Sequence, residues 1–267
     1  MANAVANAVK DGVISTELAD DLFSMAGVGA EFSSDEMQMP FIRIAQAMSP
    51  EIKKSDAKYI KDCGQGDIFN NLTKEFWDKG VEIIPCYVQT KYTEWVPIDE
   101  GGGFVREIPA TDPVLAQTTR EGATETLPNK NEVVKADNYV VLVKSDDGNW
   151  SPAILDMKST ALKISRRWKT QINLQTITHP KSKKIAKAPI FANIWKMNTV
   201  EETNKNNQTY FNYSVSKVGF VSDVQTFAAA KALHVSSAKG AIETSAPEQS
   251  ESQVETSSEK DGDEIPF

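Results

Sequence analysis

Cations are concentrated in one stretch of this 267-residue sequence. Residues 157–200 contain ten Lys or Arg and no Asp or Glu. Because no carboxylate lies nearby in sequence to neutralise them, these side chains could follow the phosphates of a nucleic-acid backbone. The alternative is a solvated basic face that is paired with acids from elsewhere in the fold. The candidate phosphate ligands are Lys158, Lys163, Arg166, Arg167, Lys169, Lys181, Lys183 and Lys184.

Aromatic side chains near this stretch could supply the second part of such a site. Unpaired bases stack on exposed rings, and each stack is worth roughly 1–3 kcal/mol. Trp168, Trp195 and Tyr210 are the candidates. Tyr210 is expected to face outward, because strand alternation places Phe211 and Tyr213 together on the opposite, core-facing side. Burial in the core is the competing interpretation for any single ring, so we expect only one or two of the aromatic residues to stack on bases.

The acidic charge lies at the two ends of the chain. The net charge is −8, yet residues 1–39 and 237–267 carry −6 each, which leaves +4 for residues 40–236. Such segregation differs from a uniformly acidic composition and indicates a surface for a polyanion. Residues 237–267 are rich in Ser and Glu and contain one aromatic residue, Phe267, so we expect them to be disordered.

The last residues of this tail are unlike the rest of it. Two bulky apolar side chains at the end of a polar segment gain nothing from solvent, and another protein could supply their pocket. The expected partner-binding tip is Asp261, Asp263, Glu264, Ile265, Pro266 and Phe267.

Several function classes receive no support from the residues. Two Cys and two His at scattered positions predict neither a disulfide framework nor a zinc site. We expect no metal, no cofactor and no enzymatic activity, because no catalytic constellation is present. The sequence has no apolar run of about 18 residues and no signal peptide, so we expect no membrane partner and a reducing cytoplasm.

The elements that must position the basic residues are mainly strands. Helical spacing over residues 158–177 predicts one helix, with Ala161, Ile164, Trp168 and Ile172 on its core-facing stripe. Further helices are expected at residues 15–26 and 222–235, and residues 108–136 are expected to form a loop or lobe. Strands are expected at residues 41–48, 81–88, 91–96, 138–144, 150–157, 191–197 and 208–218.

This order favours an OB-type five-stranded Greek-key barrel with elaborations. A split α+β sandwich is the alternative. We expect an acidic N-terminal segment with a short helix at residues 1–38, the OB-type domain at residues 39–236 and the tail at residues 237–267.

The tip resembles that of bacterial single-stranded DNA-binding proteins. In that family a disordered acidic tail ends in a short acidic run followed by Ile-Pro-Phe, and the sequence here ends in DGDEIPF. Gly262 and Glu264 depart from an all-Asp run. The resemblance implies that the tip recruits replication, recombination and repair proteins.

The body is similar to single-stranded DNA-binding proteins of tailed phages. The similar segments are MPFIRIAQAMSPEIKKSDAKYI at residues 39–60, FVREI after the triple glycine, and LDMKSTALKISRRWKTQI at residues 155–172. The resemblance implies an OB-type fold and the cytoplasm of a bacterial host. Some members of that group also assist transcription by the host RNA polymerase.

Taken together, residues and resemblance predict a protein that coats single-stranded DNA with little sequence preference. A strand-annealing recombination protein is the first alternative. A regulator of the host RNA polymerase with secondary DNA binding is the second. The sequence leaves homo-oligomer formation open.

Overall fold

The computed structural model describes residues 16–25, 28–29, 38–122, 124–204 and 207–240. The chain divides into two units, Met1–Gln38 and Met39–Phe267. The described residues of the first unit include helix α2 (Thr16–Ser24), at the position that the sequence predicts. The predicted tip, from Asp261 to Phe267, lies outside the described residues.

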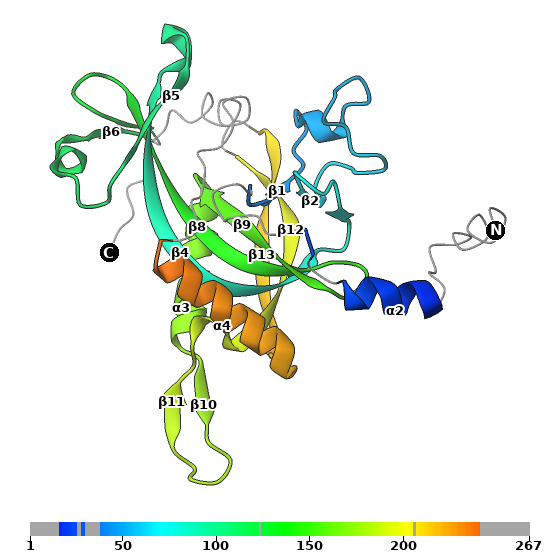
Figure 1. Ribbon diagram of the computed structural model, residues 1–267. Helices are drawn as coiled ribbons and strands as arrows, with labels where there is room; N and C mark the ends of the chain where they lie inside the picture. The colour runs from blue at the N-terminus through cyan, green and yellow to red at the C-terminus, as the bar shows by residue number, and fades with distance from the viewer. Residues whose placement is uncertain (1–15, 26–27, 30–37, 123, 205–206, 241–267) are drawn as a thin grey trace. The chain divides into compact units, whose positions relative to one another are not determined.

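The second unit is built from strands, two α-helices and short 3-10 turns (Figure 1). Its helices are α3 (Ala161–Asn173) and α4 (Val224–Ala238). Its strands are β1 (Phe41–Ile44), β2 (Ile68–Asn70), β3 (Phe76–Trp77), β4 (Val81–Val96), β5 (Gly103–Ile108), β6 (Thr119–Glu121), β7 (Thr124–Thr126), β8 (Glu132–Lys144), β9 (Trp150–Lys158), β10 (Thr176–Thr178), β11 (Ile185–Lys187), β12 (Asn193–Thr203) and β13 (Thr209–Phe220).

Eleven of these strands form one sheet, in the order β13-β12-β4-β8-β9-β1-β2-β3. β5 pairs with the C-terminal end of β4. In the small β6–β7 hairpin, β7 pairs with the first residue of β8. Neighbouring strands in the main path are antiparallel except for β1 and β9, which are parallel. Figure 1 shows that the long strands curl into an open half-barrel. The predicted mainly β, barrel-like architecture is therefore confirmed.

The longest strand, β4, was expected as two runs separated by Gln89 and Thr90. The two residues instead continue the strand, because they pair with Asn138 and Asp137 of β8. Thr90 Oγ1 donates a hydrogen bond of 2.7 Å to Asp137 Oδ1. Polar pairs thus follow the apolar and aromatic pairs that form the first part of the ladder, from Ile83 to Val88.

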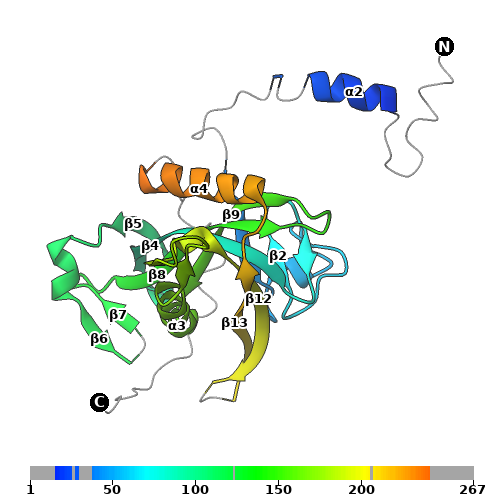
Figure 2. The same ribbon diagram turned by 90° about the horizontal axis from the view of Figure 1, so that it is seen from below.

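Two hydrophobic cores cover the two faces of the sheet. One contains Tyr139, Val141 and Trp195 and receives α3 through Trp168. The other contains Ile84, Cys86 and Leu142 and receives α4 through Ala230. Because side chains alternate along a strand, Val141 and Leu142 face opposite sides. Figure 2 shows the result, with α4 and α3 on opposite sides of the sheet.

No helix within the described part of the chain is long and apolar enough to cross a membrane.

Candidate nucleic-acid interface

Helix α3 carries the first half of the predicted basic surface. Ala161, Ser165 and Trp168 are buried on one side of the helix, as its helical spacing predicts. Trp168 stacks on Tyr139 with ring centroids 4.5 Å apart, and its ring meets Trp195 edge-on at 6.0 Å.

This packing places two of the three aromatic candidates in the core. Trp168 and Trp195 are only 1% and 2% exposed. Neither ring presents a face on which a base could stack, so both hold α3 against the sheet instead. The sequence could not separate these roles, because an aromatic residue beside cations fits both a core and a stacking site.

The buried carboxylate of Asp137, on β8, binds two side chains of α3. Asp137 accepts hydrogen bonds from Ser165 Oγ at 2.6 Å and from Thr90, and its Oδ1 lies 2.7 Å from Lys169 Nζ. Burial raises the pKa of Asp137, but the hydrogen bonds from Lys169, Ser165 and Thr90 outweigh it and the net pKa is lowered. Lys169, predicted to contact DNA, is therefore paired within the protein.

The opposite face of α3 is cationic. Lys163, Arg166 and Arg167 are exposed, and their spacing puts them on one side of the helix. Lys163 lies close enough to Glu202 for its charge to contribute to the lowered pKa of that carboxyl group. Within the described residues, Arg166 and Arg167 form no ion pair. Half-buried Lys158, just before α3, instead contributes charge beside the Asp156 carboxyl group.

The remaining predicted cations lie on a β-ribbon. The predicted helix over residues 158–177 is too long at its end, because α3 stops at Asn173 and β10 begins at Thr176. β10 and β11 pair in antiparallel register, with Ile177 opposite Ala186. We call residues 176–187 the β10–β11 ribbon. The backbone N–H of His179 donates to Lys184 O, and that of Lys183 donates back to His179 O, which closes the tip. Figure 1 shows the ribbon extending away from the sheet.

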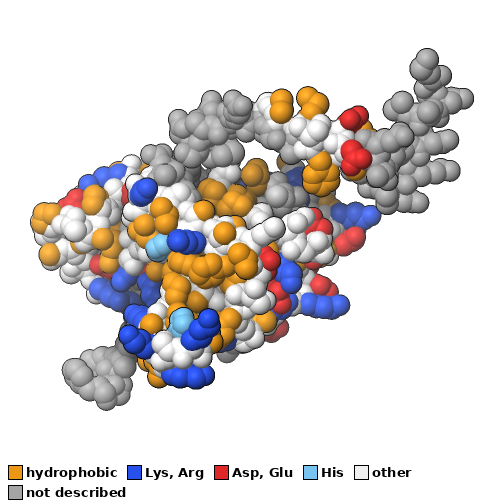
Figure 3. Space-filling view, turned by 60° about the horizontal axis from the view of Figure 1, so that its bottom comes forward, with side chains coloured by type: hydrophobic (Ala, Val, Ile, Leu, Met, Phe, Trp, Pro, Cys, Tyr) orange, Lys and Arg blue, Asp and Glu red, His pale blue; other side chains and the backbone are white. Residues whose placement is uncertain are grey.

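The ribbon brings Lys181, Lys183 and Lys184 together at its tip, and all three are exposed. Figure 3 shows blue side chains gathered around this projection near the bottom of the view. α3 leads into β10 after only two residues, Leu174 and Gln175. The predicted cations of helix and ribbon therefore belong to one continuous part of the surface.

Two functional candidates at the root of the ribbon escaped the sequence reasoning. Phe220 is 51% exposed, and Lys217 Nζ lies 4.4 Å from the centroid of its ring. Lys217 Nζ also donates a 2.5 Å hydrogen bond to Gln175 Oε1, just before β10. Alternation would put Lys217 and Phe220 on opposite faces. The β12–β13 pairing contains a bulge at Val218, which has no partner residue on β12. This extra residue reverses the alternation and brings Lys217 and Phe220 to the same side.

Tyr210 is half-buried on the β12–β13 hairpin. Its hydroxyl donates a 2.7 Å hydrogen bond to Glu202 Oε2, which also accepts from Asn212 Nδ2 at 3.1 Å. These two hydrogen bonds lower the pKa of Glu202. A carboxylate at the edge of the Tyr210 ring makes this the least cationic part of the predicted interface.

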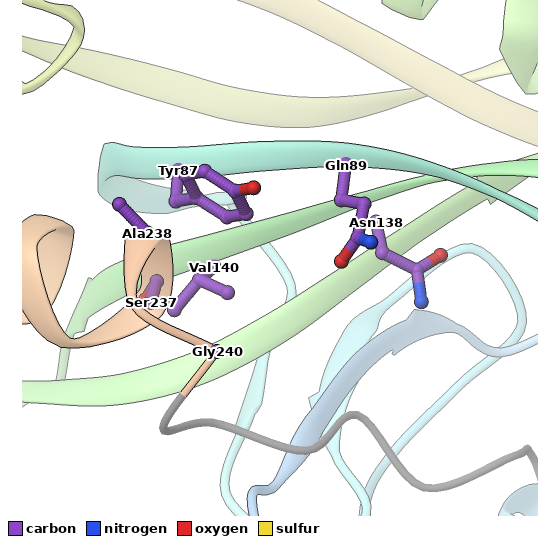
Figure 4. A pocket seen from close by; sticks show the side chains of 7 residues that line it. All are labelled: Tyr87, Gln89, Asn138, Val140, Ser237, Ala238 and Gly240. Atoms are coloured by element: carbon purple, nitrogen blue, oxygen red, sulfur yellow. The ribbon is translucent and has the colours of Figure 1, made fainter. Parts of the chain in front are cut away.

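The α4 side of the sheet holds a different feature, a hollow of about 140 Å³. Figure 4 shows the Tyr87 ring and the Gln89 amide on β4, facing Ser237 near the end of α4. Among the residues that the structure describes, no Lys or Arg lines the hollow. We therefore place the candidate interface on α3 and the β10–β11 ribbon.

Other chemistry finds little support in the described residues. They contain no group of three or more His, Cys, Asp or Glu that could hold a metal ion. Burial raises the pKa of Cys63 to about 11 and that of Cys86 to about 12. Both thiols are therefore protonated at neutral pH and unsuited to nucleophilic attack.

Comparison with known proteins identifies a family for most of the chain. Neither the comparison with curated proteins nor that with solved structures gave a match. The model of the Pam3 phage gp34-like protein family matches residues 10–243. This range includes every helix and strand described above, from α2 to α4. The chain therefore belongs to the Pam3 phage gp34-like protein family.

Proposed function

We propose that this protein binds single-stranded DNA with little sequence preference and coats and protects it. The supporting observation is the set of exposed cations on α3 and the β10–β11 ribbon. Of these, Arg166, Arg167, Lys181, Lys183 and Lys184 have no carboxylate partner within the described residues. Unpaired cations on a protruding helix and ribbon can neutralise backbone phosphates and release their counterions, independently of base sequence.

The proposal includes an OB-type arrangement for the curled sheet. Strands β4, β8 and β9 form the continuous curved centre of the sheet, and closed or partly open barrels of this kind bind oligonucleotides in other proteins. The proposal also includes a role for the C-terminal tip. Residues 261–267 would recruit replication, recombination or repair proteins. The bacterial host cytoplasm is the place of action that this role implies.

The test is a titration of labelled oligo-dT at several salt concentrations, followed by fluorescence anisotropy. We expect log K to fall linearly with log salt concentration, with a slope of about −0.7 for each neutralised phosphate. The Arg166→Glu, Arg167→Glu double variant should bind more weakly. Its slope should be shallower by about 1.4, because two contacts are lost.

The matched control is the Lys53→Glu, Lys54→Glu variant. It makes the same charge change at two exposed lysines in the loop after β1. An affinity for oligo-dT that stayed constant with salt would contradict the proposal. Equal losses of affinity in the two double variants would also contradict the proposal, because the net charge of the protein alone would then explain the binding.

A further inference from the structure

The β10–β11 ribbon stands apart from the main sheet of the second unit. It forms a two-stranded sheet of its own, and every residue from 176 to 187 is exposed. Isolated two-stranded ribbons are marginally stable in water. Ile177 and Ile185 are nevertheless 40% and 71% exposed on it. A ribbon that stands apart from the main sheet and leaves apolar side chains this exposed points to a partner outside the chain.

The shape and charge of the ribbon suit a nucleic-acid duplex. The major groove of B-DNA is about 12 Å wide and admits a two-stranded β-ribbon. Phosphates border both sides of that groove, and the tip places Lys181, Lys183 and Lys184 within six residues of one another, with no carboxylate between them. A single strand offers no groove to such a ribbon.

The root of the ribbon suits an unpaired base instead. Phe220 presents an exposed ring there, and Lys217 Nζ lies over it at 4.4 Å. The hydrogen bond from Lys217 to Gln175 ties this ring to the residue that precedes β10. An exposed ring with a cation beside it is the combination that holds a base together with its phosphate.

Helix α3 continues from this root in the opposite direction. Its outward face carries Lys163, Arg166 and Arg167, and its 13 residues span about 20 Å. Three kinds of surface therefore follow one another: a lysine-tipped ribbon, an exposed ring and a cationic helix.

We propose that these surfaces together form a site for a junction between duplex and single-stranded DNA. The lysines of the ribbon contact phosphates of the duplex, Phe220 stacks on the first unpaired base, and α3 follows the phosphates of the single strand. This inference rests on the proposed single-stranded DNA binding and adds which form of DNA the protein binds most tightly.

The experiment compares four labelled DNAs by anisotropy: oligo-dT, a blunt duplex, and the same duplex with an oligo-dT tail at a 5′ end or at a 3′ end. The full-length protein should bind one tailed duplex about tenfold more tightly than oligo-dT, because the duplex lets the ribbon lysines contact phosphates on both sides of its groove while the tail keeps the contacts of a single strand. The Lys181→Gln, Lys183→Gln, Lys184→Gln variant should bind both DNAs more weakly, but its affinity for the tailed duplex should fall by a larger factor than its affinity for oligo-dT, so that most of the preference is lost. Phe220→Leu should likewise lower the affinity for the tailed duplex more than that for oligo-dT.

The Lys53→Gln, Lys54→Gln variant is the control for lost charge, and thermal unfolding shows whether each variant stays folded. Equal affinities of the protein for oligo-dT and for both tailed duplexes would overturn the inference and leave the proposed function standing. Equal proportional losses for both DNAs in the ribbon variant would overturn it as well. Failure to bind any of the four DNAs would instead overturn the proposed function, and the inference with it.

Discussion

The side-chain amide of Gln46 forms two hydrogen bonds with the backbone of Phe211. Its Nε2 donates to the carbonyl oxygen at 2.7 Å, and its Oε1 accepts from the backbone N–H at 3.0 Å. A residue on a neighbouring strand would satisfy the same two groups. Gln46 follows β1, whereas Phe211 lies on β13 at the other end of the strand order. A side chain therefore links the two ends of the sheet where no strand ladder does.

Substitution of Gln46 by Ala tests this link. Two hydrogen bonds are lost and the polar groups of Phe211 lose their partner, so we expect the free energy of unfolding to fall by about 1–3 kcal/mol. Urea unfolding measures the change. Gln65→Ala, at an exposed position nearby, is the control, and equal effects of the two variants would contradict a closing role for Gln46.

A glycine beside the same strand allows Phe211 to approach. Gly66 has φ +91°, and a Cβ atom there would lie 2.6 Å from Phe211 Cε1. Thr199 Oγ1 also donates a 2.6 Å hydrogen bond to Gly66 O, which makes a second link between the ends of the sheet. The side chain of an alanine at this position would push the Phe211 ring away from β2.

We therefore expect Gly66→Ala to destabilise the protein more than Gly148→Ala. Gly148 also has a positive φ, but nothing lies within 4 Å of the position of its Cβ. Both variants bear the cost of about 1–2 kcal/mol for a left-handed alanine, so the difference between them reports the contact with Phe211. Urea unfolding of the two variants should show an extra loss of about 1 kcal/mol or more for Gly66→Ala, and similar losses would refute the contact.

The buried carboxylate under α3 makes stability depend on pH. The folded-state pKa of Asp137 is lowered, so its contribution is present above the unfolded value of about 3.9 and is lost as the pH falls through the folded pKa. We expect Asp137→Asn to lower the free energy of unfolding by about 1–3 kcal/mol at pH 7. The difference from the unmodified protein should shrink below about pH 4. A difference that did not change between neutral and acidic pH would contradict the role of the charge.

Much of the sheet could be predicted because the patterns of apolar and turn residues that mark its strands are local in sequence. The apolar run from Tyr139 to Val143 and the turn at residues 145–149 predict the second half of β8 and β9, and both are present. The expectation of a loop or lobe at residues 108–136 was wrong in part, because β6, β7 and the start of β8 lie there. The helical stripe of Trp168 and Ile172 likewise predicts which side of α3 is buried. These features depend on residues that are close in sequence.

Features that depend on distant residues could not be predicted. Gln89 and Thr90 continue β4 only because polar residues of β8 face them. The β10–β11 ribbon lacks an apolar period, and the bulge that brings Phe220 beside Lys217 is visible only in the pairing of two strands. The predicted cations could be found from composition, but the loss of Lys169 to Asp137 requires the fold.

The burial of Trp168 predicts an effect on stability and not on DNA binding. Its ring is packed between Tyr139 and Trp195, so Trp168→Leu should lower the free energy of unfolding by about 2–3 kcal/mol, less than the roughly 3–5 kcal/mol of a Trp-to-Ala change. The affinity of the folded variant for oligo-dT should stay within about twofold, since no stack of roughly 1–3 kcal/mol is removed. Trp150→Leu, at a half-buried position, is the control. A large loss of affinity for oligo-dT with unchanged stability would indicate that Trp168 contacts DNA after all.

The proposed recruiting tip can be tested separately from DNA binding. Phe267→Ala removes an aromatic side chain whose burial by a partner is worth about 1.5–3 kcal/mol, so capture of partners should weaken by about ten- to a hundredfold. Binding to oligo-dT should be unchanged, because the substitution removes no charge and lies far in sequence from α3 and the β10–β11 ribbon. Pull-down of replication and repair proteins from a bacterial extract measures capture, and anisotropy measures DNA binding. Val254→Ala, an apolar change within the same tail, is the control; if it reduces capture as much as Phe267→Ala does, recruitment does not depend on the terminal residues.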